Sequence, residues 1–171
     1  MRAELEYKSK EMEVGKMIDL YKPKLDDLWF REKLLADENT MSYNKAWGGV
    51  ISFPQDNWHQ WYQTWLCDSE LNHYYRYLYD TENDSYVGEI AYHYDKKRKI
   101  YICDVIVLAE NRCKGIGAKG IQLLCRVAKE NGIRALYDDI AADNPSYKLF
   151  LKEGFIIDYQ NNDVVMVVKT L

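Results

Sequence analysis

The chain has 171 residues, of which 47% are hydrophobic and 29% are charged, and its formal net charge is −4. This length suits one domain with a sizeable core, and the composition is typical of a soluble globular protein. A negative net charge provides no general attraction for nucleic acid or for an anionic membrane, so neither is expected as a partner. We expect residues 1–171 to form a single domain, with the mostly charged residues 1–16 as a candidate for a poorly ordered extension.

The cysteine and histidine positions argue against a metal site. None of the four cysteines stands in a Cys-x-x-Cys pair, and His59, His73 and His93 lack metal-ligand spacing. The N-terminus has no apolar signal region, and no apolar stretch approaches the roughly 20 residues that span a bilayer. These features predict a cytoplasmic protein with reduced thiols, no metal and no membrane attachment.

The first part of the chain mixes extended and helical patterns. Residues 17–21 are a short strand candidate, residues 24–36 carry apolar residues at helical spacing, and residues 38–49 are expected to form a loop. Ser52 and Pro54 are typical of a helix start, with Ser as the cap and Pro in the first turn. That helix would present one aromatic face, which packs on the core or walls a cleft: Trp58, Trp61, Tyr62 and Trp65.

The second part of the chain is richer in strands. Short polar turns join three β-rich segments, which predicts an antiparallel meander. Further helices and strands alternate after it, and a closing hairpin ends the chain. We predict an α/β (α+β) fold with a mixed, mostly antiparallel, twisted sheet of about six or seven strands and helices on both faces. The segments are strands 73–80, 86–94, 99–108, 133–141, 155–159 and 164–169, and helices 116–131 and 145–152.

A glycine-rich loop joins the third meander strand to the following helix. Gly115, Gly117 and Gly120 lie at the helix start, where they leave backbone N–H groups unobstructed by side chains. These donors and the positive end of the helix dipole predict an anion site, with phosphate as its ligand.

The same glycines match the dinucleotide-binding spacing Gly-x-Gly-x-x-Gly, and Asp138 and Asp139 follow about 20 residues later, where a ribose-binding acid would lie. The context argues against this alternative. An antiparallel meander precedes the loop, and too little chain follows it to build further parallel strands. The polar segment 109–114 also separates the strand from the glycines, whereas the fingerprint needs a tight turn.

A second motif suggests a different phosphate ligand. Arg112-x-x-Gly115-x-Gly117 is followed by a helix, a strand and then the segment 144–155, which begins with Asn144 and ends in Gly-Phe. Together these motifs resemble the GCN5-related N-acetyltransferase (GNAT) family over residues 85–156. The resemblance implies a sheet in which strands 101–108 and 134–141 splay apart and hold the pantetheine arm of acetyl-coenzyme A (acetyl-CoA).

The resemblance also implies a coenzyme site. The pyrophosphate would accept hydrogen bonds from the N–H groups of residues 113–118, and Lys114 and Lys119 could add positive charge. Asn144 would hold the arm from the far side. The coenzyme-binding residues so implied are Val105, Ile106, Val107, Arg112, Cys113, Lys114, Gly115, Ile116, Gly117, Ala118, Asn144, Tyr147 and Phe150.

The implied reaction is direct acetyl transfer to a primary amine of a small molecule or of a peptide or protein terminus. A base must deprotonate the amine, and we expect Asp139 in this role, with Glu89 and Asp104 as alternatives. The two-residue period of a strand places Asp138 and Asp139 on opposite faces, so only one of them should face the cleft.

The family's usual proton donor is absent. Its tyrosine lies four residues before the glycine of the Gly-Phe pair, where this chain has Phe150. Tyr147, on the same short helix, is either a replacement or a packing residue. A non-catalytic acyl-CoA sensor or regulatory module is therefore the alternative to an enzyme.

The acceptor would enter beside the aromatic region formed by residues 29–65. With acids nearby, this region suits a cationic amine that has an apolar part. The exposed end of the sheet and the aromatic helix could each support a homodimer. The expected acceptor-binding residues are Trp29, Tyr43, Asn44 and Trp61.

Overall fold

The computed structural model describes residues 17–67 and 72–171 and contains a seven-stranded sheet of order β1-β2-β3-β4-β5-β7-β6. The expected extension, residues 1–16, lies outside the described residues. Only β4 and β5 pair in parallel, which confirms the mostly antiparallel sheet and leaves no dinucleotide fold. The strands are β1 (Ile18–Tyr21), β2 (His73–Asp80), β3 (Ser85–Asp95), β4 (Ile100–Val107), β5 (Ala135–Ala141), β6 (Ile156–Gln160) and β7 (Val164–Thr170).

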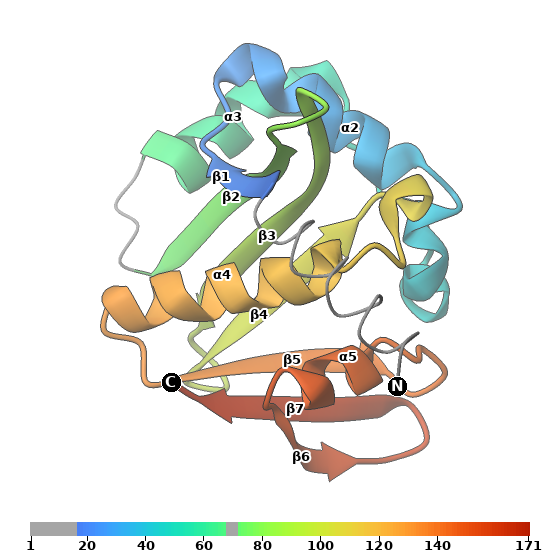
Figure 1. Ribbon diagram of the computed structural model, residues 1–171, viewed down its shortest axis with the longest axis vertical. Helices are drawn as coiled ribbons and strands as arrows, with labels where there is room; N and C mark the ends of the chain where they lie inside the picture. Colours follow the sequence, from blue (N-terminus) through green and yellow to red (C-terminus); the bar gives the residue numbers. More distant parts are fainter. Residues whose placement is uncertain (1–16, 68–71) are drawn as a thin grey trace, which may run out of the picture.

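Helices cover both faces of the sheet and bury two separate cores. On one face, α4 (Ile116–Glu130) packs its apolar stripe on β3 and β4, and α5 (Tyr147–Lys152) lies beside β7 (Figure 1). On the other face, α2 (Trp29–Ala36) and the helical segment that contains α3 (Trp58–Tyr62) enclose an aromatic-rich core with β2 and β3. Within the described part of the chain, no helix is both long and apolar enough to cross a membrane.

The strands β4 and β5 are paired over only two positions, Tyr101 with Leu136 and Ile102 with Tyr137. Beyond Ile102 the strands diverge, as Figure 1 shows. The edge of β4 that faces β5 therefore has no strand partner over residues 103–107. This is the expected splay, and it opens a gap through the middle of the sheet.

The segment expected as a loop, residues 38–49, is largely helical. A 3₁₀ helix, η2 (Thr40–Trp47), is started by Asp37, whose carboxylate accepts hydrogen bonds from the backbone N–H and the hydroxyl of Thr40. Gly48, with φ at 111°, ends it in the left-handed region that glycine favours. The expectation of a loop was wrong because side-chain capping by Asp37 stabilises helical turns there.

The expected helix after Ser52 is also not a regular α-helix. A 3₁₀ turn, η3 (Gln55–Asn57), begins after the extended Pro54 with no side-chain cap, so Ser52 does not cap it. The α-helical part, α3, continues into a π-helical turn, η4 (Gln63–Cys67). The aromatic face is nevertheless present, with the Trp61 and Trp65 rings stacked at a centroid distance of 5.8 Å.

Candidate functional site

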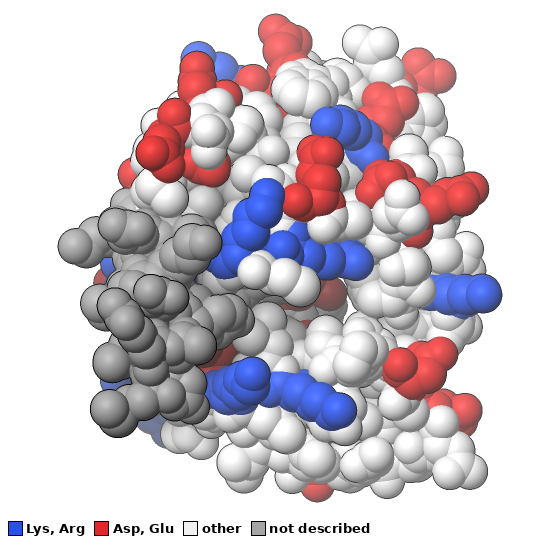
Figure 2. Space-filling model, turned by 45° about the vertical axis from the view of Figure 1, so that its right-hand side comes forward, with Lys and Arg blue, Asp and Glu red and all other residues white. Residues whose placement is uncertain are grey.

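A cavity of about 1720 Å³ lies at the splay and is lined by residues from both faces of the sheet. Figure 2 shows one face of the molecule hollowed between groups of Lys and Arg side chains, with carboxylates visible inside the hollow. The glycine loop, α4 and α5 line one side of the cavity with residues that include Gly115, Gly117, Lys119, Asn144, Leu149 and Lys152. The opposite side is lined by η2, α3 and the sheet through Arg31, Tyr43, Asn44, Trp47, Trp61, Trp65 and His93.

The glycine loop presents a row of free backbone donors. No N–H group of residues 113–118 donates a hydrogen bond to any described residue, and the first paired N–H is that of Lys119, which bonds Gly115 O at 3.0 Å. Gly115 (φ 81°) and Cys113 (φ 59°) adopt left-handed conformations that turn the chain into α4. The loop therefore has the geometry of the predicted anion site.

Of the three cations expected beside this loop, Arg112 and Lys119 line the cavity and Lys114 does not. Arg112 donates from its guanidinium to three carbonyls, Val107 O at 3.2 Å, Asn39 O at 3.3 Å and Thr40 O at 2.5 Å, so it ties the loop to η2. Lys114 bonds Glu110 O and does not line the cavity. The lysines that line it are Lys119, as expected, and Lys152, which sequence reasoning missed.

The middle of the cavity is acidic. Asp104 lies on β4 opposite the small residue Ala91 of β3, and its carboxylate makes no hydrogen bond or ion pair with the residues described. Solvent in the cavity reaches this carboxylate, yet protein encloses it on most sides. Burial, with repulsion from Glu89 and Asp139, raises the pKa of Asp104 to about 6. Burial and the charge of Asp104 likewise raise the pKa of Asp138, on β5, well above its ordinary value.

Glu89 is committed to a buried ion pair. Arg31 donates to one of its carboxylate oxygens and the Tyr75 hydroxyl donates to the other. The Arg31 guanidinium also lies over the rings of Trp61 and Phe53, at 4.7 and 5.3 Å from their centroids. Glu89 therefore lines the cavity as a structural anion, each of whose oxygens already accepts a hydrogen bond.

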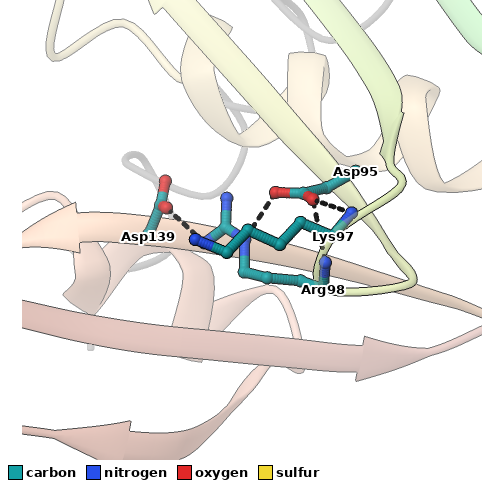
Figure 3. A network of polar contacts seen from close by, with 4 residues as sticks. All are labelled: Asp95, Lys97, Arg98 and Asp139. Carbon is teal, nitrogen blue, oxygen red and sulfur yellow. Dashed lines mark hydrogen bonds and ion pairs between the residues drawn. The ribbon is translucent and has the colours of Figure 1, made fainter.

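The Asp139 carboxylate is also held in an ion pair. Its Oδ2 accepts from Arg98 Nη1 at 2.7 Å, and Arg98 Nε donates to Asp95 at 2.6 Å (Figure 3). Asp138 and Asp139 both line the cavity, so the expectation that only one would do so was wrong. Strand alternation still holds, but the cavity crosses the sheet and touches both faces of β5.

Comparison with known proteins identifies this arrangement. The family model described as the acetyltransferase (GNAT) family matches residues 32–155. The chain belongs to this family. The resemblance inferred from two short motifs is thereby confirmed, and the chain is an acetyltransferase, in a family whose acetyl donor is acetyl-CoA.

Solved structures share the fold of this acetyltransferase. A spermidine N-acetyltransferase from Vibrio cholerae, in complex with CoA and spermine, has a TM-score of 0.71 at 18% identity over 91% of this chain and 96% of that chain. An N-acetyltransferase from Staphylococcus aureus Mu50 has a TM-score of 0.71 at 20% identity, over 90% of this chain and 98% of that chain. A Salmonella typhimurium structure with its cofactor acetyl-CoA has a TM-score of 0.69 at 16% identity, over 90% of this chain and 94% of that chain. No curated protein sequence matches the chain.

The residue at the family's tyrosine position and the candidate replacement for that tyrosine lie in different places in this acetyltransferase. Phe150 is buried and lines the cavity, whereas Tyr147 packs against the core under α4 and does not line it. Asn144 does line the cavity, but α5 begins at Tyr147, and Asn144 Oδ1 accepts from Ser146 N–H in the turn before the helix.

Three of the four expected acceptor residues line the cavity, namely Tyr43, Asn44 and Trp61. Trp29 does not: its side chain is half exposed and contacts the Tyr86 ring outside the cavity. Trp65, expected on the aromatic face of the helical segment, also lines the cavity, whereas sequence reasoning did not single out Arg31, Trp47 and His93. His93 could have been found from strand alternation, because it lies on the same face of β3 as Glu89 and Ala91.

Proposed function

We propose that this acetyltransferase moves the acetyl group of acetyl-CoA directly to a primary amine on a cationic small molecule or a peptide terminus. One observation carries the proposal. A single cavity crosses the splayed sheet, with free N–H donors and lysines on one side and carboxylates and aromatic rings on the other. Its volume, about 1720 Å³, exceeds the roughly 300–1,000 Å³ of a single-ligand pocket. There is room for the donor and the acceptor together.

The coenzyme would occupy the basic side. Its pyrophosphate matches the free N–H groups of residues 113–118, with Lys119 and Lys152 nearby as counter-charges. The pantetheine arm would lie between β4 and β5, where residues 105–107 offer an unpaired backbone edge. A peptide-like arm satisfies such an edge as a further strand would. Asn144 borders the arm from the other side.

The acceptor would occupy the acidic side. Asp104 and Asp138 favour an ammonium group, while Trp61, Trp65 and Tyr75 offer ring faces to its apolar or cationic parts. The Vibrio cholerae enzyme, which shares this fold, was solved with the cationic amine spermine. That neighbour supports the class of acceptor and leaves its identity open.

We assign the general base to Asp104 in place of Asp139. Glu89 and Asp139 are held by Arg31 and Arg98, whereas the Asp104 carboxylate has no partner among the described residues. A base with a pKa near 6 is ionised at neutral pH and still accepts a proton readily. Asp104 would take a proton from the ammonium group, and the neutral amine would attack the thioester carbonyl, polarised by a backbone N–H at the end of β4.

A panel of amines incubated with acetyl-CoA, with thiol release as the readout, tests this function. Asp104→Asn should lower kcat by about 100-fold or more while the affinity for acetyl-CoA is kept. Asp158→Asn, on the exposed strand β6, is the matched control and should behave as the unchanged protein. Full turnover by Asp104→Asn would remove this residue from the role.

The alternative expected from Phe150, a non-catalytic acyl-CoA sensor, is not proposed, because the chain belongs to the acetyltransferase family. Phe150 bears instead on which group assists the departing sulfur, since no tyrosine occupies the family position.

A further inference from the structure

We propose that Tyr43 donates a hydrogen bond from its hydroxyl to the coenzyme sulfur as the thioester breaks. This inference rests on the proposed acetyl transfer and supplies the donor that Phe150 cannot provide. It gives a catalytic role to a residue that the sequence suggested only as part of the acceptor site.

The position of Tyr43 supports this role. Its helix, η2, packs against β5 and is fixed to the glycine loop by Arg112, and the Tyr43 side chain lines the cavity. The carboxylates of Asp104, on β4, and Asp138, on β5, both act electrostatically on its hydroxyl. Tyr43 lines the same cavity as these two carboxylates of the splayed strands, and the pantetheine arm would run in that cavity.

Other tyrosines are unsuitable. Among the described residues that line the cavity, the tyrosines are Tyr43 and Tyr75. The Tyr75 hydroxyl already donates to Glu89, and Tyr147 lies outside the cavity lining. The Tyr43 hydroxyl makes no hydrogen bond to any described residue, so it is available to a ligand.

The surroundings of Tyr43 keep it protonated. Burial, and next the charges of Asp104, Glu89 and Asp138, raise the pKa of Tyr43 well above its ordinary value. A thiol has an ordinary pKa of about 8.5, so Tyr43 would not lose its proton to the sulfur. It would act as a hydrogen-bond donor that stabilises the developing thiolate without transferring the proton.

The proton balance of the reaction closes without a co-reactant. Asp104 first passes to solvent the proton that it took from the ammonium group. It then takes a second proton from the nitrogen as the C–N bond forms, and the C–S bond breaks with its electron pair passing to sulfur. Tyr43 holds the resulting thiolate by its O–H, and the proton on Asp104 then reaches the sulfur through solvent. The products are the amide and the CoA thiol, with Asp104 again ionised.

Titration of the CoA thiol in its complex with the protein tests the hydrogen bond without any acceptor. The ultraviolet absorbance of the thiolate reports its pKa. Tyr43→Phe keeps the ring and should make the bound thiol about tenfold less acidic than in the unchanged protein. Tyr159→Phe, on the exposed strand β6, is the matched control and should leave the titration unchanged. Equal thiol acidity in the Tyr43→Phe and unchanged proteins would overturn the proposal.

Turnover provides the second measurement. With an active amine, Tyr43→Phe should lower kcat by about 10- to 100-fold at unchanged acetyl-CoA affinity. Unchanged kcat would overturn the role of Tyr43 and leave acetyl transfer intact. An unchanged protein that fails to bind CoA, or binds it and acetylates no amine, would instead overturn the proposed function and this inference with it.

Discussion

Arg98 Nη1 lies 2.7 Å from Asp139 Oδ2, and this ion pair joins the β3–β4 turn to β5 across the closed end of the splay (Figure 3). Both side chains are more than one-third exposed, so the pair contributes little to stability, at most about 1 kcal/mol. Its main consequence is chemical. Asp139 and Asp104 both line the cavity, but only Asp139 of these two is paired with a permanent cation.

This relationship predicts different outcomes for two conservative substitutions. Asp139→Asn should keep kcat within about threefold of the unchanged protein, while Asp104→Asn should lose about 100-fold or more. The reason is that Asp104, unlike Asp139, has a carboxylate with no partner among the described residues and so can accept the amine proton. Steady-state thiol release measures both. A larger loss in Asp139→Asn than in Asp104→Asn would return the base role to Asp139.

The raised pKa of Asp104 predicts the pH dependence of acetyl transfer. A base works only when ionised, so kcat/KM should rise with pH through about 6 and then level off until another group titrates. With an ordinary aspartate the rise would be centred near pH 3.9. Rate profiles between pH 4.5 and 8 distinguish the two, since a flat profile over that range would contradict the assignment.

The buried pair of Arg31 and Glu89 should matter mainly for stability. Glu89→Gln leaves the guanidinium uncompensated among aromatic rings and should lower the free energy of unfolding by about 3–5 kcal/mol. Chemical denaturation measures this change. Glu130→Gln breaks an exposed pair with Arg126 on α4 and should cost less than about 1 kcal/mol. Equal costs would contradict the structural role of Glu89.

The positive charge of Lys119, beside the glycine loop at the start of α4, should strengthen acetyl-CoA binding. Lys119→Gln should weaken acetyl-CoA binding by about two- to fivefold, because a cation beside the pyrophosphate contributes up to about 1 kcal/mol. Lys129→Gln, at the far end of the same helix, is the control and should leave the affinity unchanged. Calorimetry at two salt concentrations should show the difference shrinking at high salt. Equal affinities at low salt would place the phosphate elsewhere.

Several features of the site could be predicted because they are local in the chain. The glycine loop depends on the conformations of consecutive residues, and the free donors of residues 113–118 follow from them. The antiparallel meander could likewise be predicted, because short polar turns join its strands. The type of helix after Ser52 was harder to predict. This segment begins as a 3₁₀ turn and ends as a π-helical turn, and its Trp61 and Trp65 pack against Tyr75, which is distant in the sequence.

By itself, the sequence determined the sheet and the glycine loop, because hydrophobic periods and glycine positions act over a few residues. The splayed pair of strands followed from the resemblance to the family. Only the tertiary structure decided which acid is free. Arg98 and Asp139 are 41 residues apart and Arg31 and Glu89 are 58 apart, so no local pattern reports their pairing. Asp104 differs from Glu89 and Asp139 because the fold gives those two carboxylates arginine partners and places the small residue Ala91 opposite Asp104 on the neighbouring strand.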